Sequence, residues 1–95
     1  MREQKIEQAL VEAVKKSGGR CWKFVSPGQA GVPDRIVMLP EGVLAFVELK
    51  APGKKPRPLQ LVRHRELAAL GFKVYVIDSL EQISTVLLEL KKEAV

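Results

Sequence analysis

The chain of 95 residues has a single cysteine, Cys21, and a single histidine, His64. A lone cysteine cannot form an internal disulfide or a cysteine-based zinc site. A lone histidine excludes a histidine-cluster metal site and argues against a histidine-based catalytic dyad. We expect Cys21 to pack as a small buried hydrophobe and His64 to be a surface or hydrogen-bonding residue. These absences turn attention to the carboxylates.

Long apolar segments are missing as well. No run approaches the ~20 apolar residues of a transmembrane helix, so we expect no membrane association. The N-terminal residues Met-Arg-Glu-Gln-Lys lack the apolar core of a signal peptide, which predicts an intracellular protein. Neither an internal repeat nor a low-complexity segment is present. The length suits one domain with one core, spanning residues 1–95.

Positive charge is in excess. The 16 lysines and arginines against 11 aspartates and glutamates give a net charge of +5 and a pI near 9.6. A basic surface of this kind favours a polyanionic partner, with nucleic acid ahead of an anionic membrane.

The middle of the chain carries a β-hairpin signal. Two apolar, β-branched runs are separated by Pro40-Glu41-Gly42, a short loop with glycine at the position expected to need positive φ. If Leu39 faces Val43 across this loop, counting outward pairs Asp34 with Glu48. The sequence therefore predicts both the hairpin and its register.

This register brings charges together at one end of the hairpin. Glu48 and Lys50 share a face because strand side chains alternate, and Asp34 opposite Glu48 points the same way. When two carboxylates share a site, the pKa of one of them rises unless a cation neutralises their charge. A divalent metal ion with oxygen ligands would supply that neutralisation. The alternative is a partly solvated charge cluster in which Lys50 simply pairs with Glu48.

Both hairpin strands are apolar on both faces, so helices should pack above and below the sheet. The pattern predicts an α/β domain of three layers, α/β/α, with the element order α-β-β-β-α-β-α. Trp22 is expected in the core. The expected elements are helices over 3–17 and 58–70 and from Ser79 onward, strands over 20–25 and 72–77, and the hairpin.

Glu3 and Glu7 lie on one shoulder of the apolar stripe of the first helix. A carboxylate there could reach over the sheet toward Asp34 and Glu48, or it could be an ordinary solvated residue. The sequence pattern alone leaves both readings open.

A loop rich in proline follows Lys50 and contains Lys54, Lys55 and Arg57. Its position beside the acidic pair favours phosphate contacts over a purely solubilising role. Lys23 is either an outward strand lysine or a further phosphate contact.

Taken together, Glu7, Gly31-Val32-Pro33-Asp34, Glu48-Leu49-Lys50 and Gln60 resemble the PD-(D/E)xK nuclease superfamily. More narrowly, the chain resembles the stand-alone VRR-NUC domain, the virus-type replication–repair nuclease module of phages and bacteria. The resemblance implies a restriction-endonuclease-like fold with a central mixed sheet. It also implies a location in the cytoplasm of a bacterium or a phage-infected host cell.

The resemblance implies a role for each of these residues. Asp34, Glu48 and the backbone carbonyl of Leu49 would bind Mg²⁺ or Mn²⁺, and Lys50 would orient or activate the attacking water. Glu7 would complete the site directly or through water, with Glu3 as its rival on the same shoulder. Gln60 would support the site near Lys50.

The expected activity is that of a metal-dependent DNA endonuclease, selective for branched DNA such as four-way Holliday junctions and acting as a homodimer. Two other classes of function remain open. One is a catalytically silent nucleic-acid-binding module that kept the nuclease fold. The other is a scaffold whose basic loop binds an acidic protein.

Overall fold

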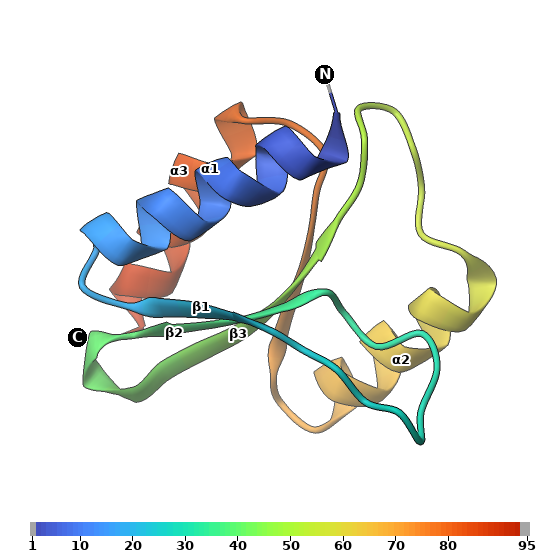
Figure 1. The fold of residues 1–95 in the computed structure, drawn as a ribbon. Coiled ribbons are helices and arrows are strands. Elements are labelled where there is room, and N and C mark those ends of the chain that lie inside the picture. Colours follow the sequence, from blue (N-terminus) through green and yellow to red (C-terminus); the bar gives the residue numbers. More distant parts are fainter. Residues whose placement is uncertain (1, 94–95) are drawn as a thin grey trace.

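The computed structural model describes residues 2–93, in which the chain forms three α-helices and four β-strands (Figure 1). The order of elements is the expected one. The elements are α1 (Glu3–Lys16), β1 (Arg20–Lys23), β2 (Arg35–Leu39), β3 (Val43–Leu49), α2 (Pro58–Ala69), β4 (Lys73–Ile77) and α3 (Glu81–Lys92), with a 3₁₀ turn, η1 (Pro40–Gly42), inside the hairpin.

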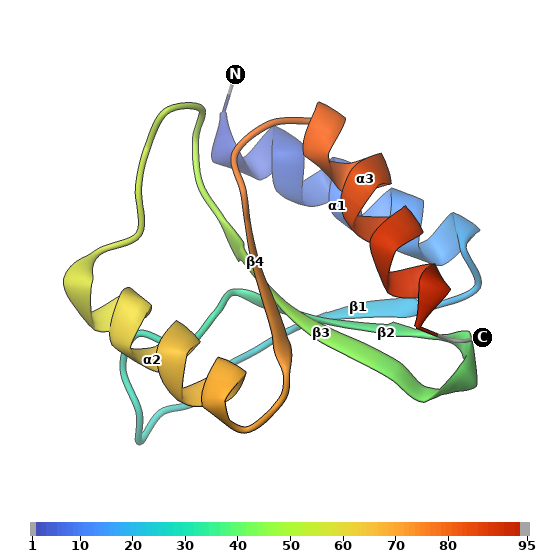
Figure 2. The same cartoon turned by 180° about the vertical axis from the view of Figure 1, so that it is seen from behind.

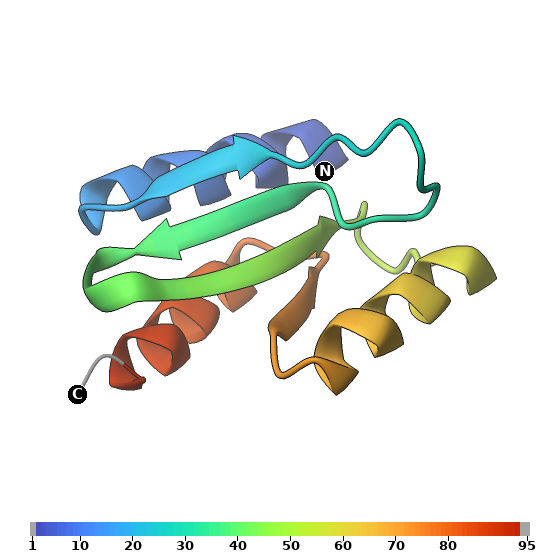
Figure 3. The ribbon, with the colours of Figure 1, turned by 90° about the horizontal axis from the view of Figure 1, so that it is seen from below.

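The strands form one mixed sheet in the order β1-β2-β3-β4. Strands β1, β2 and β3 are antiparallel neighbours, whereas β3 and β4 run parallel (Figure 3). The predicted hairpin register is confirmed, since Leu39 pairs with Val43 and Arg35 with Val47. In the loop Gly42 has φ of 75°, as expected, and Glu41 has φ of 72°.

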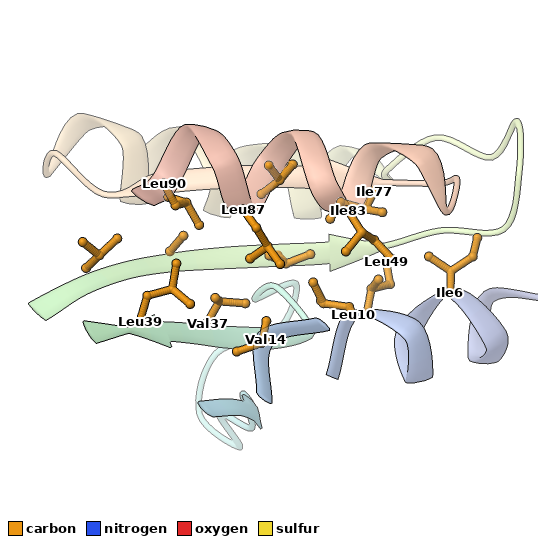
Figure 4. Packing of buried hydrophobic residues seen from close by; sticks show 14 residues of the cluster. Ile6, Leu10, Val14, Val37, Leu39, Leu49, Ile77, Ile83, Leu87 and Leu90 are labelled. Atoms are coloured by element: carbon orange, nitrogen blue, oxygen red, sulfur yellow. The ribbon is translucent and has the colours of Figure 1, made fainter. Parts of the chain in front are cut away.

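The predicted three layers are confirmed. Helices α1 and α3 lie side by side on one face of the sheet and α2 lies on the other (Figures 1 and 2). The core fills the space between the sheet and the α1–α3 layer (Figure 4). Its labelled side chains are Ile6, Leu10, Val14, Val37, Leu39, Leu49, Ile77, Ile83, Leu87 and Leu90.

The α2 layer is thinner. Helix α2 packs chiefly on β4, and Gln60 is its one buried residue. The expectation that Trp22 lies in the core is wrong, because its side chain is 60% exposed. Trp22 stands on β1, at the edge of the sheet farthest from β4, where α2 does not reach.

The element boundaries differ slightly from those predicted. Strand β1 ends at Lys23, two residues early, and α3 begins at Glu81 instead of Ser79. Cys21 packs against the core, as expected, but it is half-buried and not fully buried. Within residues 2–93, none of the helices has the length and apolarity to cross a membrane.

Candidate active site

Glu48 is the centre of the site. It lies near the end of β3, points toward α2 and is 1% exposed. Its Oε2 accepts a hydrogen bond from Nε2 of Gln60 at 3.1 Å and lies 3.5 Å from Nζ of Lys50. Its Oε1 lies 3.4 Å from Nε2 of His64. Both carboxylate oxygens therefore have partners within the protein.

Asp34 is held beside Glu48 by backbone contacts on both sides. It directly precedes β2, and its Oδ2 accepts a hydrogen bond of 2.8 Å from the backbone N–H of Leu49. Its carbonyl oxygen accepts another, of 2.9 Å, from the N–H of Phe24. Pro33, which is buried, restricts the backbone just before it. The carboxylate is thus fixed at the end of β3.

The two carboxylates carry more negative charge than their neighbours balance. Burial, and after it the neighbouring carboxylate of Asp34, raise the pKa of Glu48 from 4.5 to about 7. Lys50 lowers it, but one ammonium cannot balance two carboxylates. The oxygen-rich donor set and the unbalanced negative charge fit a hard divalent cation such as Mg²⁺ or Mn²⁺.

Gln60 joins the start of α2 to Glu48. Its Oε1 accepts a hydrogen bond from the backbone N–H of Arg57 at 2.8 Å, while its Nε2 donates to Glu48. An amide can both accept and donate in this way, whereas an ionised carboxylate would have no N–H to donate. Gln60 thus caps the helix and binds the site with one side chain.

His64 is a member of the site that the sequence analysis left out. It lies one turn after Gln60 on the same side of α2, and its side chain is 11% exposed. Burial lowers its pKa, as does nearby Lys50, while Asp34 acts in the opposite direction. The i, i+4 spacing from Gln60 was the available signal, because such residues share a helix face.

Glu7 lies apart from this group. Its helix covers the opposite face of the sheet from α2, and its Oε2 accepts a hydrogen bond of 2.8 Å from Nε of Arg35. Arg35 also donates from Nη1 to the carbonyl oxygen of Cys21 at 3.1 Å. Glu3, its rival, is exposed. Among residues 2–93, no three His, Cys, Asp or Glu side chains gather closely enough to hold a metal ion.

Arg35 is the other residue that the sequence analysis missed. On β2 it shares with Val37 and Leu39 the face that α1 covers, and its side chain is 15% exposed. A charge on such a face needs a partner. The salt bridge to Glu7 supplies it.

The four expected phosphate contacts are all exposed. Lys54, Lys55 and Arg57 lie in the loop between Lys50 and α2, and Lys23 lies on β1 opposite Arg35. The structure therefore leaves these cations free to meet an anionic partner, with the loop directly beside Lys50.

No family model matches the chain. A protein of Acyrthosiphon pisum secondary endosymbiont phage 1, named "Putative nuclease p44", is 55% identical over 87 residues, which cover 92% of each chain. A solved structure titled "VRR_NUC domain" superposes with a TM-score of 0.84 and 34% identity, covering 90% of this chain and 92% of the other.

The two matches extend over nearly the whole chain, and the fold described above agrees with them. The expectation drawn from Asp34, Glu48 and Lys50 is therefore confirmed at the level of the family. The chain belongs to the VRR-NUC family of nuclease domains.

Proposed function

We propose that this nuclease domain is a divalent-metal-dependent DNA endonuclease whose active site lies at the end of β3. The observation that carries the proposal is the pairing of Asp34 with the buried carboxylate of Glu48, only partly neutralised by Lys50 at 3.5 Å. Such a pair is unfavourable in the protein alone and becomes favourable when a cation binds.

Asp34, Glu48 and the backbone carbonyl of Leu49 would hold Mg²⁺ or Mn²⁺. The bound cation would polarise a phosphoryl oxygen and lower the pKa of a water molecule. Lys50, beside Glu48, would orient that water and stabilise negative charge on the phosphate. Gln60 keeps the Glu48 carboxylate in place through its hydrogen bond.

Glu7 would join the site through water. In the structure it is paired with Arg35, so its part in metal binding has to be tested separately from that of Asp34. Glu3 offers the matched control because it lies on the same helix, one turn earlier, and is exposed.

The substrate side of the proposal rests on charge. Lys54, Lys55 and Arg57 would contact DNA phosphates next to the site, and Lys23 would extend that contact along β1. Branched DNA, including four-way junctions, is the proposed substrate, cut by a homodimer that places two sites about a two-fold axis.

The homodimer can be tested by its mass. Sedimentation at micromolar concentration should give about 21 kDa, twice the chain mass of 10.6 kDa.

The test is cleavage of duplex, single-stranded, flap and four-way-junction DNA with Mg²⁺ or Mn²⁺. Asp34→Ala and Lys50→Ala should lose at least about a hundredfold in rate, because each removes a group at the reacting phosphate. Glu7→Gln should also be slower, whereas Glu3→Gln should match the wild type. Equal activity in the wild type, D34A and K50A would refute the assignment. Salt-dependent DNA binding with no cleavage would instead support the silent binding module.

A further inference from the structure

Two side chains of helix α2 contact the two carboxylate oxygens of Glu48. Gln60 donates to Oε2, and His64, one turn further along, faces Oε1 with Nε2 at 3.4 Å. The two side chains project from the same side of the helix. Lys50 also contacts Oε2, whereas the hydrogen-bond partner of Oε1 within residues 2–93 is His64.

This contact is not a by-product of apolar packing. Gln60 is the single buried residue of α2, and the helix exposes Leu59 and Leu61 to solvent. The inward side of α2 therefore brings polar groups to the site, beside the partly buried Val62 and Leu67. The His64 imidazole, 11% exposed, is held where a donor to Glu48 is needed.

The burial of Glu48 makes its orientation matter. Residues 2–93 contain no buried side-chain nitrogen or oxygen without a hydrogen-bond partner, and Oε1 of Glu48 depends on His64 for that. If His64 were apolar, Oε1 would lose its partner on a carboxylate that is only 1% exposed. The carboxylate would then rotate about its last bond to find another one.

We propose that His64 is a positioning residue for Glu48. By holding Oε1, the imidazole fixes the carboxylate plane so that Glu48 and Asp34 together present oxygens to a divalent cation. The inference rests on the proposed function, because it assumes that this pair binds the metal. His64 itself acts through Glu48 and touches neither substrate nor cation.

The test compares His64→Phe, which keeps a ring and loses the donor, with His64→Gln, whose amide restores a donor at similar reach. Mn²⁺ binding is measured by titration calorimetry without DNA. H64F should bind Mn²⁺ at least about tenfold more weakly, the usual scale for a group that orients a metal ligand, and H64Q should stay within about threefold of the wild type. In cleavage assays H64F should lower kcat with little change in KM for DNA.

Arg65→Gln is the matched control, because Arg65 is the next residue on α2 and is exposed. It should leave Mn²⁺ binding unchanged. If H64F does not fold, as judged by circular dichroism, His64→Leu carries the same comparison with a smaller apolar side chain. A variant that folds and binds Mn²⁺ as the wild type does, despite lacking the donor, overturns the inference.

D34A separates the two levels of the proposal. If D34A loses Mn²⁺ binding while folded H64F retains it, the metal site stands and the role of His64 is refuted. If D34A binds Mn²⁺ as tightly as the wild type, the metal lies elsewhere and both proposals fail.

Discussion

Glu48 is a buried carboxylate that lies beside a second carboxylate, and its neighbours satisfy its hydrogen bonds without balancing the charge. Gln60 donates a hydrogen bond to Oε2, Nε2 of His64 lies 3.4 Å from Oε1, and Lys50 supplies one positive charge. With Asp34 included, the negative charges still outnumber the ammonium. The protein alone relieves this by raising the pKa of Glu48, whereas a divalent cation would relieve it without protonation.

This residue predicts how the stability of the metal-free protein varies with pH. The pKa of Glu48 is about 7 in the folded state, against 4.5 for an unperturbed glutamate. The folded state therefore holds an extra proton between these values, and stability present below pH 4.5 is lost as the pH rises through 7. The loss is about 3 kcal/mol at most, and chemical denaturation between about pH 5 and 8 measures it.

Glu48→Gln isolates this effect because glutamine keeps the shape and cannot titrate. The free energy of unfolding of the wild type, minus that of E48Q, should fall as the pH rises. Added Mn²⁺ should flatten the dependence of wild-type stability on pH. His64, also facing Glu48, titrates in the opposite sense because its pKa is lowered, and it is present in both proteins. A constant difference across the range would mean that Glu48 is ionised throughout.

Some residue-level features followed from the sequence and others did not. The pairing of Asp34 with Glu48 depended only on strand alternation and on counting from the loop, which are local rules. The partners of Glu7 and His64 depend on how helices sit on the sheet. The shoulder position of Glu7 allowed it to face either Arg35 or the acidic pair, and only packing chose between them.

Two glutamines accept hydrogen bonds from backbone N–H groups at the starts of two helices, and one of the two is also at the site. Gln60 accepts a hydrogen bond from the N–H of Arg57 ahead of α2. Gln82 accepts hydrogen bonds from the N–H groups of Asp78 and Ser79 ahead of α3, at 2.7 and 3.0 Å. Gln82 thus acts as the side-chain acceptor at the entry to α3.

The shared role gives a matched pair of variants. Gln60→Leu and Gln82→Leu should each lower the free energy of unfolding by about 1 kcal/mol, because each leaves helix-entry N–H groups without their side-chain partner. Only Q60L should weaken Mn²⁺ binding, by about tenfold, because only Gln60 also donates to a proposed ligand. Thermal unfolding and titration calorimetry measure the two effects. Equal Mn²⁺ affinity in both variants would reduce Gln60 to a helix cap.

Elements with strong local patterns were predictable, and those shaped by distant partners were less so. The hairpin and α1 were set by apolar periodicity and by Gly42 and Gly18-Gly19, so their bounds are within about a residue. Trp22 was misplaced because strand alternation says that two faces exist, but not how far a covering helix extends. Helix α2 reaches β4 and leaves β1 open.

At the scale of the whole molecule, the structure separates a well-packed layer from the layer that carries the site. The core lies between the sheet and α1–α3, while α2 meets the sheet through Gln60 and His64 at the acidic pair. The basic loop from Lys50 to α2 extends from the site end of β3. The C-terminal ends of α1 and α3, with their own lysines, lie at the opposite end of the molecule (Figure 1).

This separation of charge tests whether DNA is bound by the loop or by net charge alone. The triple variant Lys54→Ala, Lys55→Ala, Arg57→Ala lowers the net charge of +5 by three. So does Lys15→Ala, Lys16→Ala, Lys91→Ala at the far end. If the loop contacts phosphates, only the first triple should weaken binding strongly. It should also make the negative slope of log K against log salt shallower by about 2–3. Fluorescence anisotropy with a labelled junction at several salt concentrations, with Ca²⁺ in place of Mg²⁺ to limit cleavage, measures it. Equal losses in both triples would show that overall charge, and not the loop beside the acidic pair, attracts the DNA.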